Sequence, residues 1–333
     1  MKESLMSTPT PGISVICIFP DSYETIRQTV FHLESQTVKD QIELVLVAPA
    51  IKATVVNALT TSGFASVIPV ETGPMYSTAE ARAIGVQAAT SPIVVFTEDH
   101  SFPERKWAEA LIRAHQQPWA VVGPAVINAN PLSPVSCANF LIEYSEWMDP
   151  APDGPARHLP GHNSAYKKDL LLRYGDQLGK LLEAESVLQW DLIACGHQLF
   201  LETSAKTRHM NFSLFSPTIL LRLQSGRLFA FTRSKHWSPQ HRLIYIAGSP
   251  MIPLVRLYRI LRQLQLPGRR VQQLPILLSI TLILLIVDAF AEAIGYSFGA
   301  GNASHKMVDL DFHRERFINE DDRLFFSKQA PIL

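Results

Sequence analysis

Short apolar runs alternate with amphipathic stretches over the first 130 residues of the chain. The apolar runs are rich in Val and Ile, and they predict β-strands at 13–19, 42–48, 65–70, 91–97 and 119–127. Apolar residues recur at helical spacing in the stretches between them, and they predict helices at 22–36, 52–63, 78–90 and 103–116. Strands that alternate with helices form mostly parallel sheets covered by helices, so the expected fold class is α/β.

The pattern is less regular between residues 128 and 211. The stretch 128–160 is rich in Pro, Asn, Ser and Asp, which indicates a long loop with one helical insert. Loops of that size in a compact domain are usually functional. A turn leads into a helix at 159–171, a further helix is predicted at 178–195, and 196–211 is interpreted as a strand followed by a loop.

The charges are unevenly distributed although they sum to zero. The interval between Glu202 and Asp288 has no acidic residue, yet it contains twelve of the 30 lysines and arginines. A cationic segment joined to an acidic body indicates an anionic partner, such as a phosphate group, a nucleic acid or a lipid headgroup. Long aliphatic runs interrupt the basic residues, and we therefore expect no nucleic-acid partner.

An uncharged apolar run at 271–287 follows directly on Arg269 and Arg270. At about 17 residues it is at the lower limit for crossing the hydrocarbon core of a bilayer, and Asp288 and Glu292 interrupt the helix beyond it. A spanning helix, a helix in the membrane interface and a helix packed within the protein all fit this pattern. The arginines before the run favour a cytoplasmic flank.

Three widely separated cysteines exclude a disulfide framework and a paired-cysteine metal site, and they fit a reducing compartment. Residues 1–11 lack the apolar run of a signal peptide, so we expect a flexible lead before the first strand. A hydrophobic content of 47% can fill a core in a chain of 333 residues.

Glu98, Asp99 and His100 come directly after a predicted strand. Open α/β sheets bind their ligands at the carboxyl ends of strands, and carboxylates with imidazoles suit divalent metal ions. Alone, such a cluster is more typical of a strand end capped by solvated residues. However, His209 also follows a predicted strand, and Glu185 lies on a predicted helix, so the ordered set favours a functional site.

Four stretches carry the features of this set in order along the chain. They are SVICIFPDSYETIRQTVFHLESQ, STAEARAIGVQAATSPIVVFTEDHSFPERKW, LPGHNSAYKKDLL and EAESVLQWDLIACGHQL. Together they resemble the first strand and its Pro-rich turn, the acidic metal motif, the Gly-x-Asn element and the catalytic-base helix of glycosyltransferase family 2. The resemblance covers roughly residues 12–211. It implies the nucleotide-sugar-binding fold called GT-A, a nucleotide-diphospho-sugar donor such as a UDP-sugar, and a glycan or lipid-linked acceptor.

The resemblance also implies roles for individual residues. Glu185 would be the catalytic base, which takes the proton of an acceptor hydroxyl and gives inversion in one displacement. Mn²⁺ or Mg²⁺ would stabilise the leaving diphosphate, with the ligands Asp99, His209 and His100. The nucleotide-sugar-binding residues would be Pro20, Tyr23, Arg82, Glu98 and Asp99. The acceptor-binding residues would be Gly161, Asn163, Arg233 and Trp237. The alternative for Arg233 and Trp237 is that this segment anchors the chain at a bilayer interface.

The sequence departs from the family pattern at three places. Thr97 stands where the acidic motif usually begins with Asp, and Ala48 and Pro49 replace an Asp that often lies near the uracil. Ala184 and Glu185 stand where the family usually has a Glu-Asp pair at the catalytic base. These departures concern the nucleotide and metal ligands more than the fold.

The expected organisation is a flexible N-terminus at 1–11, a GT-A domain at 12–211 and a basic, hydrophobic helical extension at 212–333. The expected function is that of an inverting, hexosyltransferase-type enzyme in cell-surface polysaccharide or glycolipid synthesis. It would work on the inner face of the membrane, attached peripherally to an anionic surface or by the segment near 271–287. The alternative is a catalytically degenerate nucleotide- or glycan-binding protein on the same fold.

Overall fold

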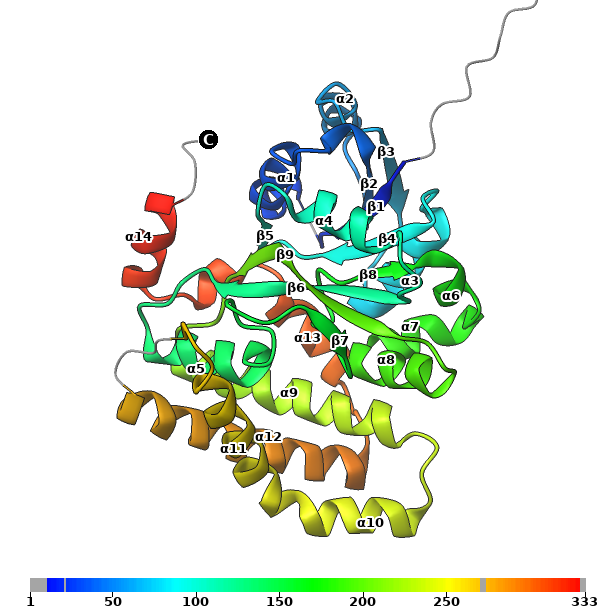
Figure 1. Cartoon of the computed structure of the whole chain (residues 1–333). Coiled ribbons are helices and arrows are strands. Elements are labelled where there is room, and N and C mark those ends of the chain that lie inside the picture. Colours follow the sequence, from blue (N-terminus) through cyan, green and yellow to red (C-terminus); the bar gives the residue numbers. More distant parts are fainter. Residues whose placement is uncertain (1–10, 21, 270–273, 330–333) are drawn as a thin grey trace, which may run out of the picture.

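The computed structural model describes residues 11–20, 22–269 and 274–329 (Figure 1). The strands are β1 (Ile13–Ile18), β2 (Ile42–Ala48), β3 (Ser66–Glu71), β4 (Ile93–Thr97), β5 (Ser101–Pro103), β6 (Val121–Asn128), β7 (Gly154–Ala156), β8 (Ala165–Lys167) and β9 (Leu199–His209). The helices before residue 211 are α1 (Arg27–Glu34), α2 (Ala53–Thr60), α3 (Thr78–Ala88), α4 (Trp107–Ala114), α5 (Pro134–Tyr144), α6 (Lys168–Leu172), α7 (Leu178–Leu182) and α8 (Glu185–Ala194). The later helices are α9 (Phe215–Ser234), α10 (Pro239–Gly248), α11 (Ile252–Leu264), α12 (Leu274–Phe298), α13 (Ala303–Asp311) and α14 (Glu320–Gln329). Short 3-10 turns are η1 (Tyr23–Thr25), η2 (Lys39–Gln41), η3 (Gly175–Gln177), η4 (Ser249–Met251) and η5 (Arg314–Phe317). Apart from Pro11, the predicted flexible lead lies outside the described residues.

The nine described strands form one sheet in the order β3-β2-β1-β4-β8-β6-β9-β5, with β7 paired to β9. β3, β2, β1 and β4 are parallel, as are β6 and β9, whereas β8 is antiparallel to both β4 and β6. Because both neighbours of β8 run against it, β4, β6 and β9 point the same way and their carboxyl ends share one edge. The predicted α/β class with a mostly parallel, helix-covered sheet is confirmed.

Both faces of the sheet are covered, which explains why its strands are continuous apolar runs in the sequence. Ile16 and Ile18 of β1 pack in a core with α3, α7 and α8. Ile13, Val15 and Cys17 of the same strand pack in a second core with α1, α2 and α4. A strand buried on both faces has no solvent side that would favour alternate polar residues.

The small residues of α3 let this helix approach the sheet closely. A Cβ atom at Gly85 would lie 2.6 Å from Cγ2 of Ile16 and 3.1 Å from Cγ2 of Val47. A larger side chain at this position would push the helix outward. The close approach matters for the site because α3 also carries Arg82, which reaches the end of β4.

Most predicted elements are present within a few residues, with three informative differences. The helix predicted at 178–195 is broken into α7 and α8, so Glu185 begins a helix instead of lying inside one. The strand predicted from 196 extends to His209, because β9 pairs with β6 again after a register shift. The three-residue strand β5, which pairs with β9, is too short to produce an apolar pattern.

Helices α9 to α12 form a bundle below the sheet in the view of Figure 1. Small residues allow α9 and α12 to pack closely, since a Cβ atom at Gly226 would lie only 2.9 Å from Cβ of Ala291. The domain boundary predicted near 211 falls between β9 and α9. The later chain returns to the sheet, however, and Phe312 joins the core that contains Ile16. The last segment therefore contributes to the same edge where β4 and β9 end.

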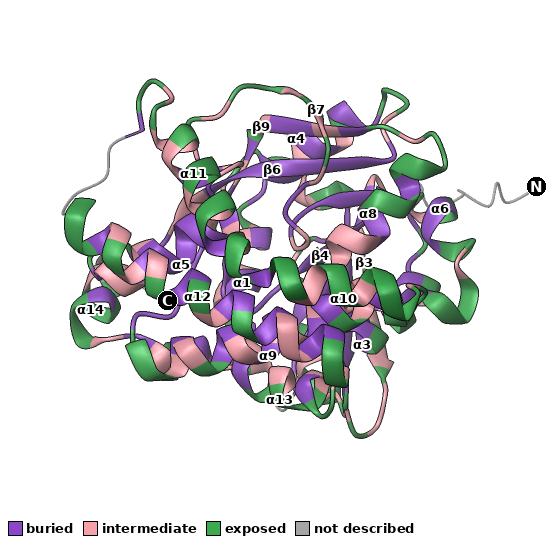
Figure 2. Ribbon diagram, turned by 90° about the horizontal axis from the view of Figure 1, so that it is seen from below, coloured by how far each residue is buried: buried purple, intermediate pink, exposed green. Residues whose placement is uncertain are grey.

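Helix α12 is the one helix of the described residues that is long and apolar enough to cross a membrane, by length and composition only. In its most apolar stretch 39% of the residues are buried inside the protein. Its buried side packs on α5 and α9, whereas its outer side exposes apolar side chains, namely Ile276, Ile283, Ile286 and Phe290. Seen from below, α10 also carries mostly exposed residues, and none of them is buried (Figure 2). Of the predicted apolar run, residues 271–273 lie outside the described ranges.

Candidate active site

The topology of the sheet brings the predicted polar segments together at one edge. β4 ends just before Glu98, β9 ends at His209, and the pairing of β5 with β9 places Ser101 opposite His209. β8 runs in the opposite direction, so the loop that precedes it, with His162, starts at this same edge. The structure thus brings the polar cluster after β4 and His209 to the same edge of the sheet.

Glu98 is the carboxylate at the centre of this group. Its Oε2 lies 2.9 Å from Nε2 of His100 and 3.6 Å from Nε2 of His209, and its Oε1 lies 2.8 Å from Nδ1 of His162. Glu98 is 9% exposed, and His100 and His209 are buried still more deeply. Donor atoms of Glu98, His162 and His209 all lie within 4.8 Å of one another, which makes them a possible metal site.

The donor atoms that face one another in this group are in ion-pair contact but form no well-aligned hydrogen bond among the described residues. They are Oε2 of Glu98, Nε2 of His100, Nδ1 of His162 and Nε2 of His209. Buried polar atoms are normally paired, so each exception needs an explanation. A cation bound between one carboxylate and several imidazoles would satisfy these atoms together, and this donor set suits a divalent ion such as Mn²⁺.

Two polar neighbours orient the imidazole rings. Nδ1 of His100 lies 2.5 Å from Oδ1 of Asp99, and Nδ1 of His209 lies 3.1 Å from Oδ1 of Asn211. Because both partners are acceptors, Nδ1 of each ring donates to them, and Nε2 of each ring faces Glu98. Such an outer hydrogen bond is the usual support of a metal-binding histidine.

Asp99 thus lies behind His100. Its other oxygen, Oδ2, accepts a hydrogen bond of 3.1 Å from the backbone N–H of His313. Both carboxylate oxygens of Asp99 therefore have protein partners, and Oδ2 faces the backbone of His313, away from the histidine cluster around Glu98. This geometry suits a residue that positions a ligand, and the metal-ligand role predicted for Asp99 stays a prediction.

The charges within the group largely balance one another. Burial disfavours the carboxylate of Glu98, but His162 and His100 outweigh this effect and hold its pKa well below its usual range. Burial lowers the pKa of His209 to about 3, which keeps this ring neutral. Burial also lowers the pKa of His162, but Glu98 more than compensates, so that its pKa is raised. A divalent cation would compete with the protons that now balance Glu98.

Arg82 connects the histidine cluster to the predicted catalytic base. Its Nη2 lies 3.2 Å from Oε1 of Glu98, and its Nη1 lies 2.5 Å from Oε1 of Glu185. Gly161, predicted to contact the acceptor, packs against this base, because a Cβ atom there would lie 2.6 Å from Cδ of Glu185. The loop before β8 can therefore approach the base only with glycine at this position.

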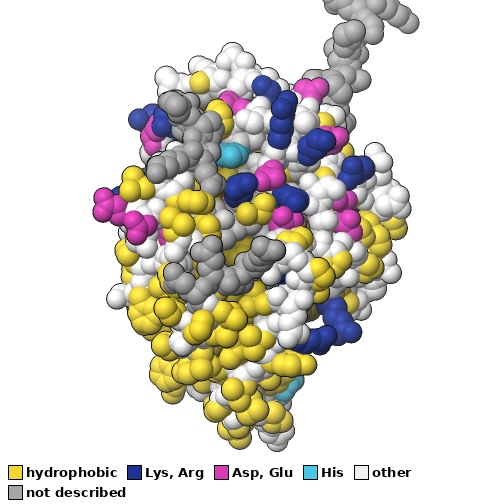
Figure 3. Space-filling model, turned by 60° about the vertical axis from the view of Figure 1, so that its left-hand side comes forward, with side chains coloured by type: hydrophobic (Ala, Val, Ile, Leu, Met, Phe, Trp, Pro, Cys, Tyr) yellow, Lys and Arg dark blue, Asp and Glu magenta, His cyan; other side chains and the backbone are white. Residues whose placement is uncertain are grey.

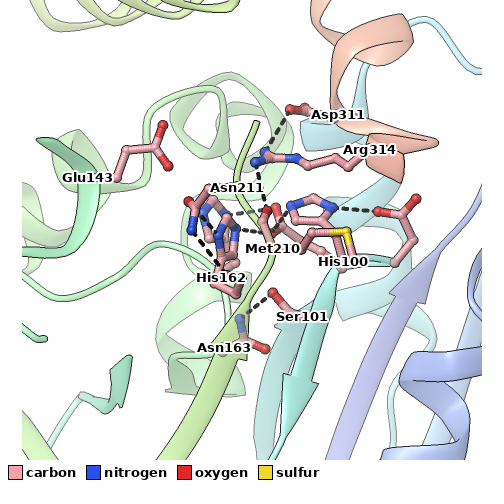
Figure 4. A network of polar contacts seen from close by, with 12 residues as sticks. His100, Ser101, Glu143, His162, Asn163, Met210, Asn211, Asp311 and Arg314 are labelled. Carbon is pink, nitrogen blue, oxygen red and sulfur yellow. Dashed lines mark hydrogen bonds and ion pairs between the residues drawn. The ribbon is translucent and has the colours of Figure 1, made fainter. Parts of the chain in front are cut away.

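Two further residues of the site, Asp311 and Arg314, are missed by the sequence reasoning (Figure 4). Arg314 is buried, its Nη1 donates to the carbonyl oxygen of Met210 at 3.5 Å, and its Nη2 lies 3.8 Å from Oδ1 of Asp311. Burial raises the pKa of Asp311 to about 6. Both residues lie in the segment 212–333, which the sequence predicts to be a membrane-associated extension. No local sequence pattern indicates that they belong to the site.

The segment around Asp311 also narrows the side of the site that faces β1. A cavity of only about 20 Å³ remains there, and its lining includes Arg82, Thr97, Asp99, Asp311 and Phe312. This volume is about that of a single water site and far below that of a ligand pocket.

Three of the remaining predicted residues lie at the periphery of this group. Pro20 follows β1, and Tyr23 packs partly buried against the core that contains Cys17. Asn163 is buried, and its Nδ2 donates to Oγ of Ser101 at 3.1 Å. The side chain of Asn163 therefore ties its loop to the segment after β4.

Arg233 and Trp237 lie together at the end of α9. The Cζ atom of Arg233 is 5.1 Å from the ring centre of Trp237 and 4.6 Å from that of Tyr245. The rings of Trp190 and Phe229 also lie within cation–π distance of this guanidinium.

A second, much larger cavity of about 930 Å³ begins at Glu98, His162 and Glu185 and extends to helices α9 to α12. Arg233 lines its far part, so the predicted acceptor residues Gly161 and Arg233 share this cavity with the predicted base. Its volume is sufficient for a ligand of several rings or for a sugar with an attached chain.

Comparison with known proteins gives similarity only at the level of structure. No family model matches the chain, and no curated protein matches it. Among solved structures, GalNAc-T7 with UDP, GalNAc and Mn²⁺ aligns at 14% identity and a TM-score of 0.46, covering 60% of this chain and 43% of that one. Residues 1–349 of S. aureus TarS align at 15% identity and a TM-score of 0.45, covering 76% of this chain and 81% of that one.

Both neighbours are glycosyltransferases of the GT-A type, the fold that the sequence resemblance implies. The chain spans less than half of the GalNAc-T7 chain. A likeness at these scores carries no argument about activity, so the function has to be argued from the site itself.

Proposed function

We propose that the chain is a metal-dependent, inverting glycosyltransferase of the hexosyltransferase type that uses a nucleotide-diphospho-sugar, most simply a UDP-sugar. The observation that carries the proposal is the chain of contacts from the buried donor atoms around Glu98, through Arg82, to Glu185. A metal-binding cluster and a candidate base thus share one buried arginine and one cavity. This combination suits a reaction in which an anionic group leaves as a hydroxyl attacks.

Glu98 and His209, with His100 and His162, would hold the ion, and Asp99 would orient His100. A divalent ion bound there supplies stabilisation of the charge on the leaving diphosphate. Glu185 accepts the proton of the acceptor hydroxyl as its oxygen forms a bond to the anomeric carbon. The bond from that carbon to the diphosphate breaks with its electron pair, so the sugar is inverted. Arg82 orients Glu185 before the reaction.

The test is the turnover of UDP-sugars in the presence of Mn²⁺ by the wild type and by Glu185→Gln. We expect the rate of transfer, or of hydrolysis where water is the acceptor, to fall by about 10²-fold or more, which is the usual scale for removing a general base. Binding of UDP should persist in the variant. Glu183→Gln is the matched control, because Oε1 of Glu183 already accepts 2.7 Å hydrogen bonds from Ser77 and Ser304.

A fall of the same size in Glu183→Gln, with full activity in Glu185→Gln, would move the role of base to Glu183. Binding of UDP and Mn²⁺ without turnover of any UDP-sugar by the wild type would favour the non-catalytic binding protein instead.

We further propose that the enzyme works on the cytoplasmic face of a membrane, in glycolipid or surface-polysaccharide synthesis. Hydrophobic side chains gather over the lower half of the molecule, below a band of charged ones (Figure 3). Exposed apolar residues of this region lie on α10 to α12 and include Leu243, Leu254 and Tyr258. Because one side of α12 packs on α5 and α9, this helix suits a position in the membrane interface better than a lone span.

A further inference from the structure

The large cavity opens through the apolar surface of the helical bundle. Three residues that line it are also exposed and therefore mark its mouth: Ile244 at 68%, Met251 at 57% and Val255 at 44%. They lie on α10, η4 and α11, whose outward side chains form the surface that we assign to the membrane. A ligand that enters here passes an apolar rim, and on the proposed membrane surface it would come from the lipid phase.

The interior combines an apolar wall with several arginines, two of which form no direct ion pair with a carboxylate of the described residues. Leu228 and Phe229 of α9 contribute to the wall. Among the lining arginines, Arg222 and Arg256 form ion pairs of 2.8 Å with Glu143 and Asp288. Each of these two arginines is therefore balanced by a carboxylate.

Arg233 and Arg259 differ from these two arginines. Arg233 donates to the hydroxyls of Tyr296 and Tyr245, at 3.4 and 3.2 Å. Arg259 is exposed at the mouth, and in the described part of the chain neither arginine has an ion-paired carboxylate. A cation at the rim of an apolar channel is suited to a phosphate group whose chain remains in lipid.

We propose that this cavity binds the acceptor as a phosphate-bearing lipid. Its apolar chain would leave between α10 and α11, its phosphate would lie near Arg259 and Arg233, and its hydroxyl-bearing head would face Glu185. This inference rests on the proposed glycosyltransferase function, which it extends by naming the class of acceptor. A phosphatidylinositol-type lipid and a polyprenyl diphosphate sugar share the chemistry that the cavity requires.

Gly248 offers a way to close the mouth without disturbing the fold. It lines the cavity, a Cβ atom there would meet no atom within 4 Å, and its backbone is in the ordinary helical region. Gly248→Trp should therefore narrow the entrance, with Gly248→Ala as the matched control. Arg259→Gln removes the cation at the rim and keeps a polar side chain of similar length.

The experiment uses the full chain on phosphatidylcholine vesicles that contain photoreactive phosphatidylinositol or a photoreactive polyprenyl diphosphate sugar, with the reactive group in the apolar chain. We expect labelling of Leu228 or Phe229 inside the cavity in the wild type and in Gly248→Ala, and loss of that labelling in Gly248→Trp. Arg259→Gln should reduce it about tenfold, the scale of one charge-assisted hydrogen bond. Labelling by photoreactive diacylglycerol, which has no phosphate, should be unaffected by this variant.

Labelling confined to outward residues such as Leu243 and Leu254 with both lipids would overturn the proposal, because it would place the chains beside the cavity. Labelling of α9 by one lipid alone supports it and identifies the source of the phosphate. Hydrolysis of UDP-glucose or UDP-N-acetylglucosamine with Mn²⁺ is measured in parallel on the wild type. Hydrolysis without labelling of α9 contradicts only this inference, whereas the absence of both UDP binding and hydrolysis in the wild type contradicts the proposed function.

Discussion

Replacing Arg82 by methionine should destabilise the protein by about 3–5 kcal/mol, the usual cost of removing one partner from a buried ion pair. The guanidinium is 7% exposed and bridges Glu98 and Glu185. Methionine preserves much of the volume, so the loss is mainly electrostatic. Glu98 keeps its histidine neighbours, whereas the one basic partner left to Glu185 among the described residues is His162 at 3.9 Å. Most of the cost should therefore come from Glu185.

Unfolding in urea, followed by tryptophan fluorescence, measures this loss directly. In a chain of this size, each kcal/mol lost from the free energy of unfolding lowers the melting temperature by about 2 °C. A drop of about 6–10 °C is therefore expected. The control is the double variant Arg82→Met, Glu185→Gln. It should be more stable than Arg82→Met alone, because the second change removes the uncompensated charge. A loss below about 1 kcal/mol, or strictly additive effects, would refute the idea that Arg82 holds the two carboxylates.

Two other predictions concern stability and membrane attachment. Burial lowers the pKa of His115 in the folded protein from 6.5 to about 4. As the pH falls, the unfolded chain is therefore protonated at His115 before the folded protein is. This difference should cost about 3 kcal/mol of stability between pH 6.5 and pH 4. The stability difference between wild type and His115→Leu in urea should shift by this amount over that pH range, and a constant difference would contradict the assignment. Wild-type protein should float with phosphatidylserine vesicles at low salt, and Leu254→Asp should weaken flotation, since Leu254 is exposed on the proposed contact surface. Wild-type protein that stays in the soluble fraction would exclude the membrane assignment.

The alternation of strands and helices was predictable because both faces of the sheet are buried. Apolar runs such as 42–48 are recognisable when every residue of a strand contacts the core, and all seven residues of β2 are buried. The position of His209 at the same sheet edge as the polar cluster after β4 was also predictable. Both lie at strand ends, and parallel strands bring their carboxyl ends to one edge.

The central role of Glu98 could not be read from the sequence. Three adjacent polar residues alternate in direction, and only the structure shows that Asp99 faces the backbone of His313 while Glu98 faces the histidines. Arg314 is missed for a different reason. It comes from a segment more than 200 residues beyond β4 in the sequence, and such long-range contacts leave no local pattern.

Mn²⁺ binding in the presence of UDP, followed through the loss of the electron paramagnetic resonance signal of the free ion, decides whether Glu98 lies at the centre of a metal site. One Mn²⁺ should bind per chain in the wild type and none in Glu98→Gln or His209→Ala. Asp99→Asn should bind more weakly by about 10- to 100-fold, as expected when a residue that supports a ligand is changed. Full Mn²⁺ binding by Glu98→Gln, together with its loss in Asp99→Asn, would contradict the account and return the metal to Asp99.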